Sequence, residues 1–221
     1  MEINDISFYF YIWIFLLVLS VPFFIMHHKR YVKLQKQRKE QGDKGEEYVS
    51  KILNSLSQDY FCIDDLLLRY KNNTHQIDHV IVSRYGVFVL EIKNFRGVIK
   101  GSGFDMKWKQ INGDKSRSFY NPEYQNGMHC EVVSAVGKVR DDSIFPYVVF
   151  VGRCELQLED VSRVIHSSEV LEKILEHHEV LIDDEKVYKI YSRLINSNIN
   201  SRKAREAHKK RVQKIKSFTK A

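Results

Sequence analysis

Two acidic residues and a lysine on neighbouring segments are the side chains of this sequence best suited to chemistry. Asp78 lies at the start of one apolar run, Glu91 and Lys93 lie at the end of the next, and Ser83-Arg84-Tyr85-Gly86 separates the two runs. β-Branched and aromatic runs on either side of such a segment predict a tight β-hairpin. If its two middle residues form the loop, Asp78 lies directly opposite Glu91.

The alternation of side chains along a strand places Asp78, Glu91 and Lys93 on one face of this hairpin. Both faces are otherwise largely apolar, which predicts two central, buried strands. Opposed carboxylates repel each other, and ionised groups are costly to bury without partners. A divalent cation held by both carboxylates, or the ammonium of Lys93, would relieve this repulsion. The residues therefore predict a carboxylate metal site with a cation beside it.

Two other interpretations of these three residues stay open. A buried network of Asp78, Glu91 and Lys93 can serve only to hold the strand register, without any metal. A hairpin shifted by one residue would instead place the two carboxylates on different faces of the sheet.

The order Ile77-Asp78-His79 followed by Glu91-Ile92-Lys93 resembles the active-site pattern of the PD-(D/E)XK nuclease superfamily. More narrowly, residues 42–152 resemble the nuclease-related domain called NERD. The further features that carry this resemblance are Gly45-Glu46 at the start of a helix, Gly97, Trp108, Asn121-Pro122 and Gln125. The resemblance implies an α/β fold of the restriction-endonuclease type, with a mixed central sheet flanked by helices.

The resemblance also gives the central residues a role in phosphodiester hydrolysis. Asp78 and Glu91 would hold Mg²⁺ or Mn²⁺ as hard oxygen ligands, and the backbone carbonyl of Ile92 and waters would complete an octahedron. Lys93 would orient the attacking water and offset the charge that develops on the phosphate.

Two further residues each allow a functional and a structural interpretation. In the resembling family a Glu at the position of Glu46 faces the metal site, so Glu46 would contact the metal through water. An acidic residue is also favoured at a helix N-terminus for its charge alone. Gln125, in the first turn of a helix begun by Asn121-Pro122, would position a water or a phosphate, or would be a surface glutamine.

The first 41 residues predict a membrane anchor and its connector. Residues 6–26 form an almost unbroken apolar run without charge, which matches the roughly 20 residues that cross a bilayer. Lys and Arg cluster directly after this run, which places the C-terminal side in the cytoplasm. We expect residues 1–28 to be a single-pass signal anchor in the cell membrane and residues 29–41 a basic linker. A cleaved signal peptide and a buried core helix are the alternatives.

The rest of the chain predicts helices and strands in an α/β order. Helices are expected from Gly45 and over 121–138, 168–178 and 183–195, and strands over 60–68, in the hairpin, near 97–103, and over 106–111, 145–152 and 161–165. We assign residues 42–152 to a core domain, 153–200 to a C-terminal strand and helical extension, and 201–221 to a basic tail.

The positive charge of the chain is concentrated in that tail. The whole chain carries +7, and residues 201–221 hold nine Lys and Arg and one Glu, a net +8, which leaves −1 for the rest. Such a tail would bind nucleic acid or the anionic inner leaflet, or remain a solvated end.

The cysteines argue against a disulfide framework and a zinc site. Cys62, Cys130 and Cys154 are far apart and form no CxxC pair, which is typical of reduced thiols in a cytosolic domain. No histidine falls into a ligand pattern with them.

These features together predict a membrane-anchored, divalent-metal-dependent nuclease that hydrolyses phosphodiester bonds of nucleic acid, DNA before RNA. The assignment as a nuclease depends on the resemblance, because the residues alone predict only a carboxylate metal site. The competing class is a non-catalytic, membrane-tethered binding module or scaffold with a degenerate nuclease fold. In that class the carboxylates are structural and the basic tail does the binding, so metal binding that depends on Asp78 and Glu91 separates the two.

Overall fold

One long helix begins the chain. The computed structural model describes residues 3–218, with side chains at 13, 15 and 20–214, and the chain divides into two compact units, Met1–Asp43 and Lys44–Ala221. Helix α1 (Ile3–Leu53) runs through both, so the helix expected to start at Gly45 starts far upstream. The polar linker is rich in strong helix formers, and an isolated glycine costs a helix only about 1 kcal/mol, so neither Gly42 nor Gly45 ends it.

The predicted membrane anchor gains no support from this helix. Among the residues whose side chains the structure describes, no helix is long and apolar enough to cross a bilayer. Most of the predicted span, residues 6–26, lies outside those residues. The anchor therefore stays a prediction from the sequence.

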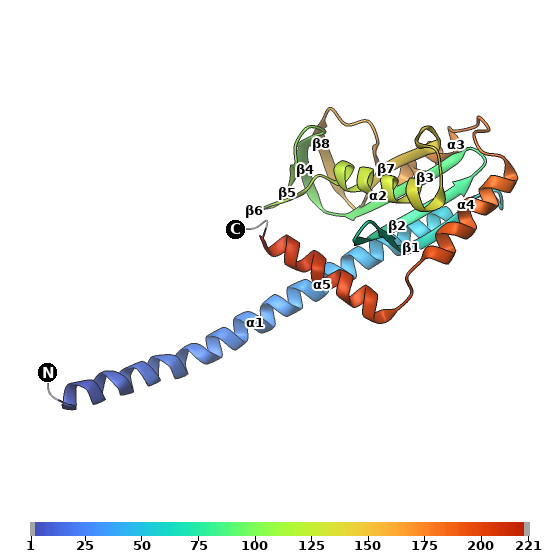
Figure 1. Ribbon diagram of the computed structural model, residues 1–221. Helices are drawn as coiled ribbons and strands as arrows, with labels where there is room; N and C mark the ends of the chain where they lie inside the picture. Colours follow the sequence, from blue (N-terminus) through green and yellow to red (C-terminus); the bar gives the residue numbers. More distant parts are fainter. Residues whose placement is uncertain (1–2, 219–221) are drawn as a thin grey trace. The chain divides into compact units, whose positions relative to one another are not determined.

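A five-stranded mixed sheet lies at the centre of the second unit (Figure 1). Its strands, in order across the sheet, are β1 (Phe61–Tyr70), β2 (Asn73–Ser83), β3 (Gly86–Asn94), β7 (Ile144–Val151) and β9 (Val164–His166). The first three pair antiparallel, whereas β7 runs parallel to β3 and β9 parallel to β7. β3 is the middle strand and is buried from Gly86 to Ile92, as its two apolar faces predict.

The hairpin between β2 and β3 has the predicted register. Ser83 pairs with Gly86, and the ladder continues to the pair of His79 and Leu90. The next two residues in this register are Asp78 and Glu91, so the alternative of a hairpin shifted by one residue is wrong.

A second, four-stranded sheet was not predicted. Its order is β6 (Lys115–Tyr120), β5 (Lys107–Asn112), β4 (Gly97–Ser102) and β8 (Cys154–Glu159). β6 is polar along most of its length, and β8 is a short strand in which apolar residues alternate with polar and acidic ones. Neither has the apolar run that indicates a buried strand. Trp108 on β5 is fully buried beneath this sheet, which makes it a core residue.

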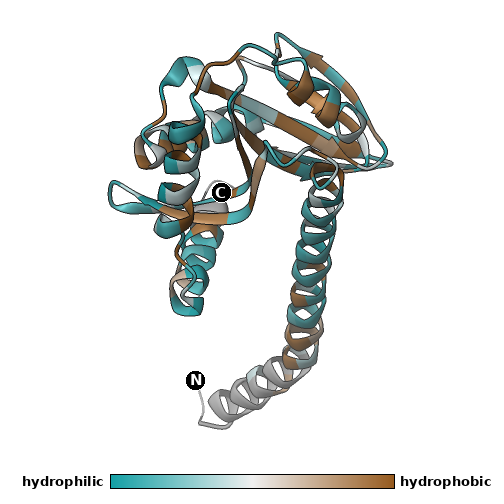
Figure 2. Cartoon of the chain, turned by 90° about the vertical axis from the view of Figure 1, so that its right-hand side faces the viewer, coloured by the Kyte–Doolittle hydropathy of each residue, from teal (hydrophilic) through white to brown (hydrophobic). Residues whose placement is uncertain are grey.

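Helices cover both faces of the larger sheet. The helical elements between β6 and the basic tail are α2 (Pro122–Gly137), the 3-10 turns η1 (Asp141–Ser143) and η2 (Ser167–Glu169), α3 (Val170–Leu175) and α4 (Asp184–Ser197). Val49 and Leu53 of α1 belong to a core cluster with Leu90 of β3, whereas Val132 of α2 belongs to a cluster with Val89. Successive residues of β3 thus face opposite helices, and the strands carry many of the brown, hydrophobic stretches in Figure 2.

The basic tail forms helix α5 (Arg202–Phe218), which packs against the β1–β2 end of the larger sheet. Arg205 Nη1 binds Asp65 Oδ2 at 2.6 Å, His208 Nδ1 lies 2.9 Å from Thr74 Oγ1, and Arg211 donates to the Thr74 carbonyl. One face of the described part of the tail therefore packs against the sheet, and what the tail binds stays a prediction. Its outward face carries exposed basic side chains, namely Arg202, Lys203, Lys209, Lys210 and Lys214.

Asn126 holds α2 against the sheet. Its side chain is fully buried, and Nδ2 donates to the carbonyls of Val89 on β3 at 2.9 Å and of Tyr147 on β7 at 3.1 Å. One side chain thus fixes the helix relative to two strands.

We predict that Asn126→Ala lowers the free energy of unfolding by about 3 kcal/mol, because it removes two hydrogen bonds to buried carbonyls. Urea unfolding followed by circular dichroism measures this loss. Asn196→Ala, which replaces an exposed asparagine in α4, is the matched control and should stay within about 0.5 kcal/mol of wild type. Equal stability of both variants would show that Asn126 does not anchor α2.

Candidate active site

The end of β3 brings together three of the predicted site residues. Glu91 is buried with 3% of its side chain exposed, and its Oε1 pairs with Lys93 Nζ. The same Nζ donates to Gln125 Oε1 at 3.1 Å, so Gln125 is not merely a surface residue. The ammonium of Lys93 is therefore held between a carboxylate from its own strand and an amide from α2.

Asp78 lies where β2 separates from β3. Beyond the pair of His79 and Leu90 the ladder ends, and the Ile92 amide donates to Asp78 Oδ2 at 2.7 Å. The carboxylate of Asp78 thus accepts the hydrogen bond of the Ile92 amide in place of a backbone carbonyl of a neighbouring strand. The Ile92 peptide adjoins the site through its N–H, and the role of its carbonyl as a metal ligand stays a prediction.

Glu46 approaches the same place from α1. A Cβ at Gly45 would lie 2.8 Å from Asn94 Cβ, so a glycine is needed for the helix to come this close to the end of β3. The negative charge of Glu46 contributes to raising the pKa of Asp78, which places Glu46 within electrostatic reach of the site. Whether Glu46 contacts a metal through water is a separate prediction.

The two opposed acids titrate in opposite directions. Burial, the charge of Glu91 and the charge of Glu46 raise the pKa of Asp78 well above its usual range. Asp78 as a residue is partly exposed, yet its carboxylate is surrounded by enough protein for burial to be the largest cause. Burial also acts to raise the pKa of Glu91, but Lys93 and His129 outweigh it and lower that pKa to about 2. Lys93 thus neutralises Glu91 more than Asp78.

His129 belongs to the site and was missed from the sequence. It is buried on α2, and its Nδ1 lies 3.3 Å from Glu91 Oε2. Neither atom has a well-aligned hydrogen bond among the described residues. The spacing of Gln125 and His129 was the available signal, because residues four apart share one face of a helix.

The donor set fits a hard divalent cation. Glu91 Oε2 is buried without a hydrogen-bond partner in the described structure, and the surroundings of Asp78 disfavour its ionised form and raise its pKa. Mg²⁺ sites commonly use one or two carboxylates and keep several waters. Among the described side chains, no group of three or more His, Cys, Asp or Glu residues could hold a metal. A cation here would therefore rely on the two carboxylates and on oxygen atoms from outside this set.

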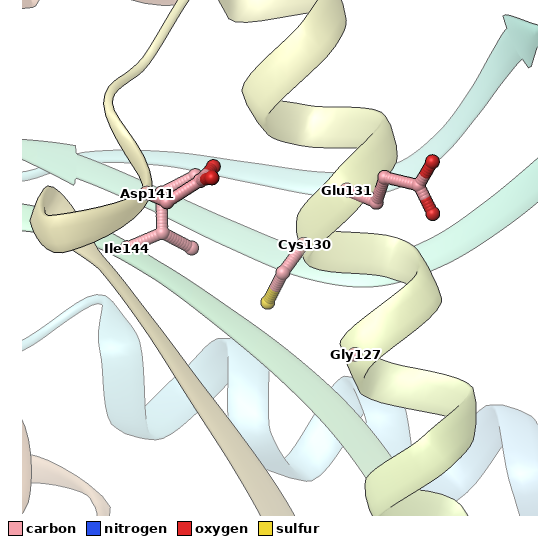
Figure 3. A pocket seen from close by; sticks show the side chains of 5 residues that line it. All are labelled: Gly127, Cys130, Glu131, Asp141 and Ile144. Carbon is pink, nitrogen blue, oxygen red and sulfur yellow. The ribbon is translucent and has the colours of Figure 1, made fainter.

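A cavity on the other side of α2 offers no reactive group. It measures about 270 Å³ and is lined by Gly127, Cys130, Glu131, Asp141 and Ile144 (Figure 3). Glu131 points away from Cys130 in Figure 3 and accepts a hydrogen bond from Tyr70 Oη, and Asp141 accepts one from Ser134 Oγ. Burial raises the pKa of the Cys130 thiol to about 12, which keeps it protonated and unreactive.

Comparison with known families identifies the family of this chain. The nuclease-related domain (NERD) profile matches residues 41–151, about half of the chain, and the candidate residues named above lie within this span. The chain belongs to the nuclease-related domain family. An uncharacterized protein of Bacillus anthracis is 28% identical over 175 residues, which cover 76% of this chain and 82% of that relative. No solved structure matches the chain.

We predict that neutralising the two acids of this NERD domain changes the stability of the metal-free protein in opposite directions. The lowered pKa of Glu91 stabilises the fold above the usual carboxyl range, by on the order of 3 kcal/mol, and this contribution is lost as the pH falls towards about 2. The raised pKa of Asp78 destabilises the fold increasingly as the pH rises through that pKa. Glu91→Gln should therefore lower stability at neutral pH, and Asp78→Asn should raise it.

Urea unfolding in EDTA, over a pH series from neutral down to about pH 2, measures both effects. Asp78→Asn should remain more stable than wild type at neutral pH and converge with it in acid. A loss of stability in Asp78→Asn at neutral pH would mean that its charge is balanced within the metal-free fold, contrary to this account.

Proposed function

We propose that this NERD protein is a divalent-metal-dependent nuclease that hydrolyses phosphodiester bonds of nucleic acid, with DNA preferred over RNA. The observation that carries the proposal is the arrangement at the end of β3, where the Glu91–Lys93 pair faces Asp78 and is contacted by Gln125. Membership of a nuclease-related family supports the same reaction class.

Asp78 and Glu91 are the residues that would hold Mg²⁺ or Mn²⁺, together with the carbonyl of Ile92. A bound cation would supply a Lewis acid for the phosphoryl oxygen and lower the pKa of a water. The protein's own residues orient the two carboxylates, the Ile92 amide through its hydrogen bond to Asp78, and Lys93 and His129 through their contacts with Glu91.

Lys93 would act on the substrate rather than on the metal. Its side chain is 15% exposed, and its ammonium contacts Glu91 and Gln125. A cation fixed in this way would offset the negative charge that develops on the phosphate and would orient the attacking water. Gln125 would position that water or a phosphate oxygen, and Glu46 would contact the metal through water.

A non-catalytic binding module is the second candidate, and one observation favours it. Lys93 already neutralises Glu91 without any metal, as the lowered pKa of Glu91 indicates. In that case the acids and the lysine only stabilise the end of β3, and the exposed basic face of α5 would bind nucleic acid or anionic lipid. Metal binding separates the two candidates.

We predict that wild-type protein binds Mg²⁺ or Mn²⁺ in calorimetry and that Asp78→Asn and Glu91→Gln lose this binding. Lys93→Ala should retain the metal but lose cleavage by about 100-fold or more, since it removes a charge needed at the transition state. Cleavage is measured with single-stranded DNA, duplex DNA and RNA. Lys100→Ala, which replaces an exposed lysine on β4, is the matched control and should cleave like wild type.

Two results together would reject the nuclease hypothesis and favour the binding module. Calorimetry would detect no heat of metal binding to the wild type, and none of the site variants would reduce cleavage.

We retain the single-pass membrane anchor as a prediction from the apolar run at residues 6–26 and the basic residues after it. Full-length protein should stay in the membrane pellet after an alkaline wash, and deletion of residues 1–30 should release it. Deletion of residues 201–221 is the control that tests whether the basic tail holds the protein there instead. A reporter fused after Ala221 should behave as cytoplasmic, and an exported reporter or full-length protein in the supernatant would contradict the anchor.

A further inference from the structure

A cavity of about 450 Å³ lies where the chain crosses twice from the larger sheet to the smaller one. It is lined by Asn94, Arg96, Gly152 and Arg153. One crossing joins β3 to β4 and the other joins β7 to β8 (Figure 1). Because β3 pairs parallel with β7, and β4 with β8, the two crossings run side by side. Each crossing contributes one arginine to the cavity.

The backbone beneath the two arginines is tightly held. Gly152 has φ +96°, and a Cβ there would lie 2.9 Å from the Phe95 carbonyl oxygen, so only glycine allows the crossings to approach this closely. The Gly97 amide donates to the Arg153 carbonyl at 3.3 Å, and Gln110 Nε2 donates to the Arg96 carbonyl at 2.8 Å. Both guanidinium groups therefore extend from fixed positions.

The two arginines lack acidic partners within the described structure. Both are exposed, and neither side chain makes an ion pair or hydrogen bond with another described residue. A third guanidinium, that of Arg117, lies 4.7 Å above the Phe95 ring nearby. The neighbouring acid Glu155 accepts a hydrogen bond from Gln157 instead. Adjacent like charges repel each other, so this arrangement suits an anionic ligand better than a structural role.

We propose that Arg96 and Arg153 form a phosphate-binding subsite for the backbone of a nucleic-acid strand that passes the candidate active site. This inference rests on the proposed function. It adds a second contact between the protein and its nucleic-acid substrate, at a phosphate other than the one that reacts. Guanidinium groups bind phosphate through two parallel hydrogen bonds. Asn94, which lines the cavity, directly follows Lys93 at the end of β3, so the cavity and the candidate site both adjoin this strand end. A strand that carries one phosphate per about 3.4 Å of rise can present phosphates to both places.

The test measures binding of a labelled DNA duplex to the full-length protein in EDTA, where no cleavage occurs, over a series of salt concentrations. The double variant Arg96→Ala/Arg153→Ala should bind more weakly, and the slope of log affinity against log salt should fall by about 1.8, since each phosphate contact contributes about 0.9. Arg69→Ala is the matched control. It removes one exposed arginine from β1, at the far edge of the larger sheet, and should leave the slope unchanged.

A second variant separates charge from geometry. Arg96→Lys/Arg153→Lys keeps both charges but loses the planar fork, so the salt slope should be retained while affinity falls. Inorganic phosphate should compete with the duplex on wild type and lose this effect in the double alanine variant.

Wild-type affinity and slope in the double alanine variant would overturn the subsite, as would an equal loss in Arg69→Ala or a wild type that does not bind the duplex. Loss of binding to phosphatidylglycerol vesicles without loss of duplex binding would likewise overturn it in favour of a lipid site. Because this assay needs no cleavage, a protein that binds as expected but never cleaves would reject the nuclease and keep the subsite.

Discussion

The hydrogen bond from the Ile92 amide to the Asp78 carboxylate is the interaction on which the candidate site depends. It lies where the ladder between β2 and β3 stops, after the pair of His79 and Leu90. A buried amide that loses its strand partner is costly unless another acceptor replaces it. Asp78 supplies that acceptor, so the strands can separate without leaving a donor unpaired. The separation opens the end of β3 to α1 on one side and α2 on the other.

The charges gathered at this opening are only partly balanced. Lys93 and His129 stabilise the ionised form of Glu91, whereas Asp78 faces the charges of Glu91 and Glu46 with less compensation. Perturbed carboxylates of this kind are concentrated at functional sites. The imbalance is what a divalent cation would correct, and it is the physical reason to prefer an active site over a structural network.

The two sheets would have different roles in such a site. The larger sheet carries the acids and Lys93, and Asn126 fixes α2 so that Gln125 and His129 reach them. The smaller sheet begins where β3 and β7 leave the larger one, and the paired crossings place Arg96 and Arg153 next to the end of β3. Chemistry on one sheet and phosphate contact at its junction with the other would together hold a polyanionic strand in place.

The sequence by itself determined the features that depend on local chemistry. The tight turn set the hairpin and its register, and Asn121 followed by proline set the start of α2, because these signals act within a few residues. The tertiary structure alone decided which distant elements meet. The polar strand β6 exists because it pairs with β5. His129 reaches Glu91, and Arg96 lies beside Arg153, through contacts between segments far apart in the chain. The pattern of one segment does not say which distant segment it meets, so only the folded chain reveals these contacts.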